Sequence, residues 1–258
     1  MRNTIRKLQS QKGKQPIVMV TAYDYPMARL VDEGVDAILV GDSLGMVVQG
    51  RDSTLPVTMD EIVYHTRMAG RGSQQAALLA DLPFMSYQAS VEDAVRNAGR
   101  LAKEAGAQAV KLEGGREFAE HIRAITASGL PVMGHLGLTP QSIHRFGGYG
   151  KQGKTEQAAT RLLEDARIME EAGMVMVVLE NIPHQLARDI TDALKVPTIG
   201  IGAGPHCDGQ VQVLHDLLGL IPDFRPRHAV RYAEHGQSTR EAISRYAEDV
   251  RSGNFVSE

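Results

Sequence analysis

Short apolar runs alternate with helix-like stretches along almost the whole chain. Strand-length aliphatic runs occupy residues 17–21, 37–40, 77–81, 109–112, 132–135, 174–179 and 198–201. Helical spacing of apolar residues, or a closing glycine, marks the stretches near 26–34, 59–72, 90–106, 116–128, 155–172, 184–194, 209–219 and 238–252. This alternation is typical of βαβ units that build a parallel sheet.

The number of these units predicts a closed barrel. Seven strands are clear, and the only stretch left for an eighth is residues 228–230. The chain has 258 residues, which is close to the usual size of one barrel of this kind. We therefore expect a single-domain (β/α)₈ TIM-type barrel over residues 1–258, an α/β protein, rather than an open doubly wound sheet.

A polar residue stands at or just beyond the carboxyl end of five successive runs. In chain order these residues are Asp42 with Ser43, Asp81, Lys111 with Glu113, His135, and Glu180. Ligands of parallel α/β folds bind at the carboxyl ends of the strands. The pattern therefore predicts a polar site at one rim of the barrel, and we expect its side chains to lie near solvent.

Asp42 and Asp81 follow neighbouring strands, so a barrel brings their carboxylates close together. Two close carboxylates repel each other unless a cation or a shared proton offsets their charge. Mg²⁺ takes oxygen ligands and accepts one or two protein carboxylates beside water and substrate oxygens. The alternative for each aspartate alone is a helix N-cap, but their pairing favours a metal site. Ser43 is placed to donate to a substrate carboxylate.

Lys111 and Glu113 are two positions apart on one strand, so their side chains share a side while Leu112 points toward the helices. This places an ammonium beside a carboxylate; a structural ion pair is the alternative. Glu180 ends an aliphatic run, where loss of solvent would raise the pKa of its carboxyl and suit it to act as a general base. For Glu180 the alternative is a salt bridge across the rim.

Composition narrows the possible partners. The net charge of −3 lacks the basic excess of a nucleic-acid-binding protein, so no nucleic-acid partner is expected. No apolar run approaches the ~20 residues that span a bilayer, and no apolar segment follows the basic N-terminus, so no membrane partner is expected. The single cysteine, Cys207, excludes an intrachain disulfide and fits a reducing, cytoplasmic location.

Several ordered motifs resemble one known family. They lie at residues 20–26 (VTAYDYP), 40–46 (VGDSLGM), 53–58 (STLPVT), 64–67 (YHTR), 110–115 (VKLEGG), 134–141 (GHLGLTPQ) and 199–205 (IGIGAGP). Together they resemble the ketopantoate hydroxymethyltransferases from about residue 19 to residue 219. One departure is Met85, where the family pattern has glycine, and the resemblance is weaker after residue 225.

The resemblance implies a magnesium-dependent enzyme that moves a one-carbon unit from 5,10-methylenetetrahydrofolate to 3-methyl-2-oxobutanoate through a Mg²⁺-stabilised enolate. The product, 2-dehydropantoate, belongs to pantothenate and coenzyme A biosynthesis. By the same resemblance Asp42, Asp81 and Glu113 serve the metal and Glu180 accepts the proton. The 2-oxo acid is then bound by a set of four residues: Asp42, Ser43, Asp81 and Lys111. The family also implies a homo-oligomer, often a decamer.

Two alternatives to this assignment stay open. One is a magnesium-dependent 2-oxo acid carbon–carbon lyase on a similar barrel, which would act without folate. The other is a non-catalytic barrel that only binds a metabolite. The complete set of rim residues argues against a catalytically inactive protein, because an inactive protein need not keep all of these residues together.

Overall fold

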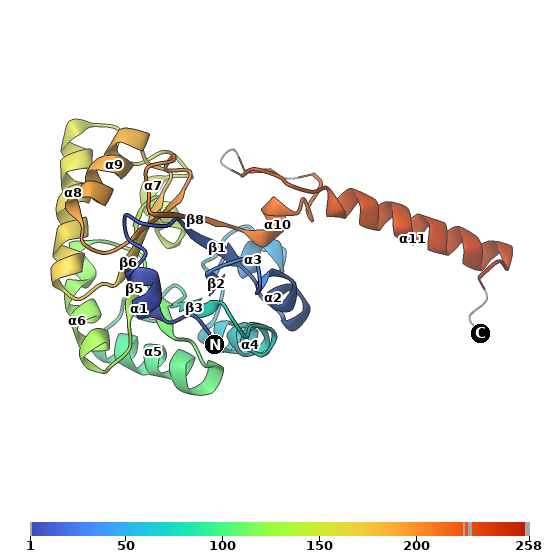
Figure 1. The fold of residues 1–258 in the computed structure, drawn as a ribbon, viewed down its shortest axis with the longest axis horizontal. Helices are drawn as coiled ribbons and strands as arrows, with labels where there is room; N and C mark the ends of the chain where they lie inside the picture. Colours follow the sequence, from blue (N-terminus) through green and yellow to red (C-terminus); the bar gives the residue numbers. More distant parts are fainter. Residues whose placement is uncertain (1, 224, 227–228, 256–258) are drawn as a thin grey trace. The chain divides into compact units, whose positions relative to one another are not determined.

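Eight parallel strands close into a barrel in the structure, a computed structural model that describes residues 2–223, 225–226 and 229–255 (Figure 1). The strands follow one another around the barrel in chain order. They are β1 (Ile17–Thr21), β2 (Ala37–Val40), β3 (Ala77–Asp81), β4 (Ala109–Lys111), β5 (Val132–Gly137), β6 (Met176–Glu180), β7 (Thr198–Ile201) and β8 (Gly209–Gln212). The predicted (β/α)₈ fold is confirmed.

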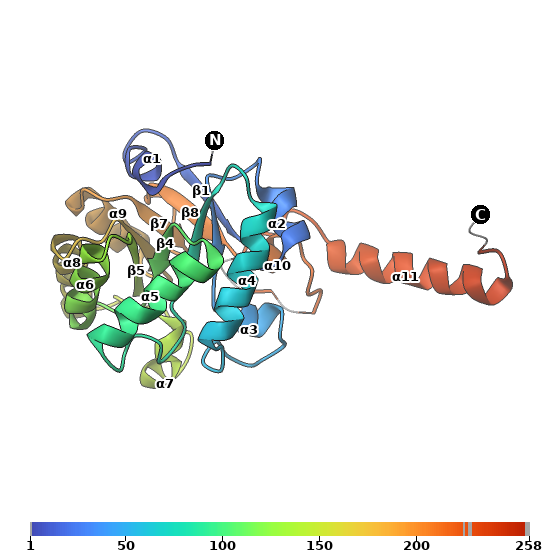
Figure 2. The same cartoon turned by 90° about the horizontal axis from the view of Figure 1, so that it is seen from below.

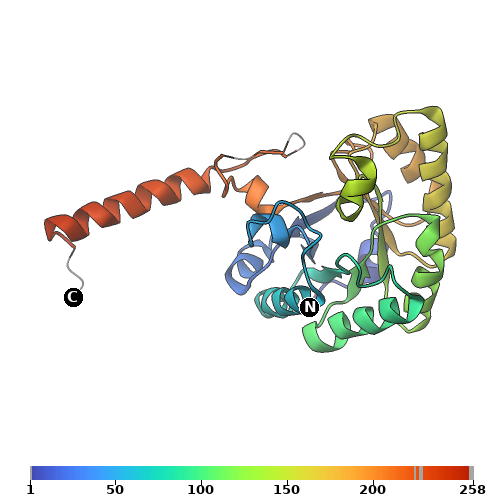
Figure 3. The ribbon, with the colours of Figure 1, turned by 180° about the vertical axis from the view of Figure 1, so that it is seen from behind.

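Helices that connect the strands form the outer layer (Figures 1 and 2). The main ones are α2 (Tyr25–Val31), α4 (Met59–Gly72), α5 (Val91–Ala105), α6 (Ala119–Ala127), α8 (Glu156–Glu171) and α9 (His184–Ala193). Successive members of this set contact each other around the barrel, and Figure 3 shows the same ring from behind. Shorter elements are α1 (Ile5–Gln9), α3 (Leu44–Val47), η1 (Arg116–Phe118), η2 (Pro140–Ser142), α7 (Ile143–Phe146) and α10 (Leu214–Leu217).

Local sequence signals explain where these helices begin and end. Thr58 and Glu61 form a capping box at the start of α4, with each side chain bonded to the other residue's backbone N–H. Ser90 caps α5 by accepting from the backbone N–H of Asp93, and Gly106 ends that helix in the left-handed conformation. The predicted helices at residues 59–72 and 90–106 are confirmed.

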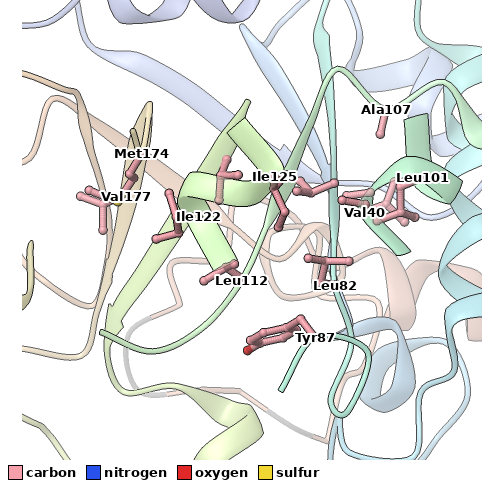
Figure 4. Close-up of a cluster of buried hydrophobic side chains, with 14 of the residues drawn as sticks. Val40, Leu82, Tyr87, Leu101, Ala107, Leu112, Ile122, Ile125, Met174 and Val177 are labelled. Carbon is pink, nitrogen blue, oxygen red and sulfur yellow. The ribbon is translucent and has the colours of Figure 1, made fainter. Parts of the chain in front are cut away.

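The buried apolar residues form two layers, one on each side of the sheet. Leu82, Tyr87, Leu112 and Ile122 belong to the layer between strands and helices (Figure 4). A second cluster contains the inward-facing residues of the strands, such as Leu79 on β3. Because neighbouring strand residues alternate between the layers, residue parity decides which side chains face the barrel axis. Leu112 faces the helices, as predicted.

The eighth strand lies earlier in the chain than predicted. Gly209–Gln212 pairs with β7 and closes the barrel, and the backbone N–H of Ile17 donates to the carbonyl of Asp208 at 2.8 Å. The helix predicted from residue 209 is therefore wrong at its start, and only α10 is helical there. Residues 229–230 form no strand, and residue 228 lies outside the described part of the chain. A glycine at 209 permits this closure because a Cβ there would lie 2.4 Å from the carbonyl oxygen of Ile17.

The chain groups into two compact units, Met1–Val211 and Gln212–Glu258. The first contains the barrel up to β8. The second contains α11 (His235–Ser252), whose side chains Ile243, Tyr246 and Val250 are all about half or more exposed. The expectation of one domain over residues 1–258 stays a prediction. Among the helices that the structure describes, none has the length and apolar character needed to cross a bilayer.

A single methyl group at the β8–β1 junction should destabilise the barrel. Gly209→Ala places a Cβ against the Ile17 backbone, which cannot move without opening the junction, and overpacking of this kind costs roughly 1–3 kcal/mol. Gly99→Ala is the matched control, because a Cβ there meets no atom within 4 Å on α5 and alanine favours helix by ~0.5–1 kcal/mol. Urea unfolding should show opposite signs for the two variants. Equal stability of both variants would contradict this account of barrel closure.

Candidate active site

On four strands, counting in steps of two along the residues that face the barrel axis ends at the candidate site residues. Ala77 and Leu79 of β3 face the axis, and the next inward position is Asp81. The same step of two residues gives Lys111 after Ala109, His135 after Met133, and Glu180 after Val178; it also gives Glu113 after Lys111. Asp81 pairs with Lys111 across neighbouring strands. Period-two geometry therefore carries these charged side chains to one end of an otherwise apolar barrel interior.

Lys111 is the centre of the charge cluster. Its Nζ lies 3.2 Å from Asp81 Oδ1, 3.7 Å from Glu113 Oε1 and 3.3 Å from His135 Nδ1. Burial alone would lower the pKa of the ammonium, but the neighbouring carboxylates raise it above its usual value. Lys111 is 4% exposed, so the expectation of a rim near solvent is wrong for this residue. The ammonium is a buried cation that compensates buried carboxylates.

Asp42 and Asp81 are close to each other and buried. The backbone N–H of Asp42 donates to Asp81 Oδ2 at 3.0 Å, and Gln141 Nε2 donates to Asp42 Oδ2 at 2.8 Å. Burial raises the pKa of both carboxyls, and for Asp42 the charges of Asp81 and Glu113 raise it further. The N-cap alternative does not hold, because the cap of α3 is Ser43 and α5 is capped by Ser90.

Gln141 and Tyr87 hold Glu113 in place, and sequence reasoning gave neither of them a role. The backbone N–H of Gln141 donates to Glu113 Oε2 at 2.9 Å. The Tyr87 hydroxyl lies 2.8 Å from both the Glu113 carbonyl and Gln141 Oε1, and it accepts from the Glu113 N–H at 3.0 Å. Gln141 ends the motif at residues 134–141, which was the available signal. No pattern in the sequence pointed to Tyr87.

His135 joins this cluster to Glu180. Its Nδ1 lies 3.3 Å from Glu113 Oε1, and its Nε2 lies 3.2 Å from Glu180 Oε2. The second pair is an ion-pair contact, because Nε2 makes no well-aligned hydrogen bond. Burial and Lys111 lower the pKa of the imidazole, but Glu113 and Glu180 outweigh them and raise it to about 9. This shift favours the imidazolium form of His135 at neutral pH.

The position of Glu180 depends on a close approach of the β5 backbone to the β6 backbone. Gly137 pairs with Glu180, and a Cβ at Gly137 would lie 2.2 Å from the Glu180 carbonyl oxygen. Gly137 also has φ +94°, a conformation that glycine adopts without strain. The Glu180 side chain is 14% exposed, more than any other member of the cluster, so it is the carboxylate that borders solvent.

Ser43 lies beside the cluster and is half-buried. Its Oγ is 2.8 Å from the Tyr23 hydroxyl, and a Cβ added at Gly41 would approach both Ser43 Oγ and Asp81 Oδ2. Ser43 therefore lies next to the aspartate pair. Met85 is farther along the loop after β3, with φ +63° and a side chain that is 56% exposed. That left-handed backbone explains why glycine suits this position.

The donor set fits a divalent cation that keeps water or substrate oxygens in its shell. Asp81 Oδ1 is buried and makes no hydrogen bond, and the two aspartates carry uncompensated repulsion that a cation would relieve. Within the described residues, no three His, Cys, Asp or Glu side chains are arranged as a metal-binding group. Mg²⁺ does not require three protein ligands. Glu113 Oε1 lies near both Lys111 and His135 and its Oε2 accepts from Gln141, whereas in the described part of the chain Asp81 Oδ1 has Lys111 alone as a neighbour of opposite charge. Asp42 and Asp81 are therefore the better donors.

Solved structures with a similar barrel fold include enzymes that share little sequence with this chain. A trigonal crystal form of 2,3-dimethylmalate lyase, described as a PEP mutase/isocitrate lyase superfamily member, aligns with a TM-score of 0.66 at 17% identity, covering 95% of this chain and 83% of that chain. A phosphoenolpyruvate phosphomutase from Streptomyces platensis subsp. rosaceus aligns with a TM-score of 0.64 at 15% identity, covering 99% and 92%. The chain therefore shares the barrel fold of these two proteins.

Sequence comparison gives the family of this chain. The profile described as ketopantoate hydroxymethyltransferase matches residues 2–258. A 3-methyl-2-oxobutanoate hydroxymethyltransferase of Pelobacter propionicus is 58% identical over 252 residues, covering 97% of this chain and 93% of the relative. The same enzyme of Syntrophus aciditrophicus is 58% identical, covering 95% and 90%. The chain belongs to the ketopantoate hydroxymethyltransferase family, and the family resemblance drawn from its motifs is confirmed.

Removing the central ammonium should destabilise the protein. Lys111→Met leaves Asp81 and Glu113 buried without their cation, and breaking a buried pair in this way costs roughly 3–5 kcal/mol. Arg96→Met is the control, since it breaks an exposed ion pair with Asp93 that is worth about 1 kcal/mol or less. Denaturant unfolding at pH 7 should separate them. The loss of unfolding free energy in Lys111→Met should become smaller as pH falls, because protonation of the buried carboxylates removes their uncompensated charge. A loss no larger than that of Arg96→Met would refute the buried-pair account.

The raised pKa of His135 predicts a specific pH dependence. A folded-state pKa of about 9, against the ordinary 6.5, stabilises the protein fully below pH 6.5, and the stabilisation disappears as pH rises through 9. His135→Gln should therefore flatten the fall in unfolding free energy between pH 6.5 and 9. Proton NMR of the imidazole should give the same midpoint. A midpoint near 6.5 would show that Glu113 and Glu180 do not hold the charge.

Proposed function

We propose that this protein transfers a hydroxymethyl unit from 5,10-methylenetetrahydrofolate to 3-methyl-2-oxobutanoate, giving 2-dehydropantoate. Membership of the family supports ketopantoate hydroxymethyltransferase activity in pantothenate synthesis. The observation that carries the finer proposal is the continuous chain of contacts from Asp42 and Asp81 through Lys111 and His135 to Glu180. It supports the proposal because side chains that could bind a 2-oxo acid lie near a carboxylate that could remove its proton.

The 2-oxo acid would bind at the aspartate end of the cluster. Asp42 and Asp81 would hold Mg²⁺, with Glu113 beside it. When bound, the ion supplies Lewis-acid polarisation of the keto group. Lys111 contributes positive charge that offsets the substrate carboxylate and the charge that develops on the keto oxygen. Ser43 donates its hydroxyl to the carboxylate, with Tyr23 fixing the direction of Ser43 Oγ.

Glu180 would remove the proton from C3 of the 2-oxo acid. His135 Nε2, 3.2 Å from Glu180 Oε2, orients the carboxylate. The resulting enolate carbon forms a bond to the methylene carbon of the folate as one C–N bond of the methylene bridge breaks, and the freed nitrogen takes the proton that Glu180 removed. The oxygen of water then replaces the second nitrogen, which takes a proton from that water, and tetrahydrofolate leaves. The described residues carry the proton and the charge, and no covalent attachment to the protein is needed.

The proposal also includes a cytoplasmic location and association of copies into a homo-oligomer. Ile243, Tyr246 and Val250 are spaced three and four residues apart, so they share one face of α11 and leave it apolar and exposed. The single cysteine fits a reducing compartment. The number of copies, for which the resemblance suggests ten, follows from the family alone.

Hydrogen exchange at C3 tests the proposed function directly. Protein, Mg²⁺ and 3-methyl-2-oxobutanoate in D₂O should lose the C3 proton signal in NMR without any folate. Glu180→Gln keeps the size of the side chain and removes its basicity, so exchange and turnover should both fall by ~10²–10⁴-fold. Exchange by Glu180→Gln at the wild-type rate would assign the proton to another group. Full product formation without folate would favour a different reaction on the same barrel.

A further inference from the structure

A glycine-rich loop carries an exposed aromatic ring close to Glu180. Residues 147–153 contain four glycines and Tyr149, whose side chain is 49% exposed. A Cβ added at Gly147, Gly148 or Gly150 would meet no atom within 4 Å, so open space surrounds this part of the loop. The ring is therefore not a core residue, and the charge cluster leaves it without an assigned role.

The loop is nevertheless fixed to the active site by Asn181, the residue after Glu180. Asn181 Nδ2 donates to the Tyr149 carbonyl at 3.1 Å, and the Asn181 carbonyl accepts from the Gln152 N–H at 3.0 Å. Asn181 has φ +46°, a left-handed conformation that asparagine tolerates better than most residues. At the far end, Gly153 lies against Leu186 of α9. These contacts hold the backbone that carries Tyr149.

Tyr149 also lies within electrostatic reach of the proposed base. Burial and the charge of Glu180 both raise the pKa of its phenol. Glu180 is in turn the member of the cluster that borders solvent. Any second substrate that meets a carbanion formed beside Glu180 must approach from this open side. Asn181, the residue after Glu180, binds the Tyr149 backbone, so the loop that carries the ring borders this side.

We propose that Tyr149 forms one wall of the binding site for the one-carbon donor and stacks against its planar heterocyclic ring. The inference rests on the proposed function, since it needs a second substrate that is flat and aromatic. A tyrosine ring held by its backbone offers such a surface at a small cost in side-chain entropy. Stacking tolerates different ring chemistry, so an exposed ring in open space suffices without dedicated hydrogen-bond partners.

Truncation of the ring should weaken donor binding and leave proton removal intact. For Tyr149→Ala, the KM for 5,10-methylenetetrahydrofolate, and the Kd for tetrahydrofolate as a probe, should rise about 5- to 150-fold. Tyr149→Phe keeps the ring and should stay within about twofold of wild type. Tyr64→Ala, which removes an equally exposed ring from the outer helix α4, should leave both constants unchanged.

The folate-free exchange of the C3 proton in D₂O separates this inference from the proposed function. Wild-type exchange with an unchanged donor KM in Tyr149→Ala would overturn the stacking role and leave the proposed function standing. Loss of exchange in Tyr149→Ala together with a lower melting temperature would show a structural role for the ring and would also overturn the inference. Absence of exchange in the wild type would reject the proposed function itself.

Discussion

The buried ammonium of Lys111 is the interaction on which the site depends. Asp81 and Glu113 come within 3.2 and 3.7 Å of its Nζ inside a barrel interior otherwise filled with aliphatic side chains. Buried carboxylates are tolerated only when a cation or a proton offsets their charge. Burial raises the pKa of both Asp42 and Asp81 above the ordinary value although Lys111 lowers both, and the charges of Asp81 and Glu113 raise that of Asp42 further. A divalent cation would complete the charge compensation.

The barrel produces this arrangement by register. The inward positions of β3 to β6 are aliphatic until the last step, where they become Asp81, Lys111, His135 and Glu180. The two parts of the site then differ in solvent contact. The aspartate pair is buried, and Gln141, which is held by the Tyr87 hydroxyl, donates to Asp42; this suits a cation that has lost part of its water shell. Glu180 faces the open side, where a second substrate enters.

Much of the fold and of the site could be predicted from the sequence, because strand residues alternate with a period of two and because capping residues mark the helix ends. The strands ending at Asp81 and at Lys111 were visible as apolar runs, and α4 was marked by Thr58 and Glu61. β8 was missed although Gln210, Val211 and Gln212 alternate, because a single apolar side chain, that of Val211, in a short polar strand gives a weak signal. Tyr87 and Gln141 were not assigned roles because their contacts join residues 26 and more positions apart. The burial of Lys111 was also missed, because the position of a residue at the end of a strand does not show whether the neighbouring loops cover it.

The most direct test of the central claim is the number of protons released when Mg²⁺ and 3-methyl-2-oxobutanoate bind. If Asp42 and Asp81 share uncompensated charge, the pair retains a proton that the cation displaces. Calorimetry in buffers of different ionisation enthalpy should then show proton release that depends on pH and is lost when Asp42 is replaced by asparagine. Binding that releases no proton at any pH between 5 and 8, or that is equally strong in the presence of chelator, would contradict the account.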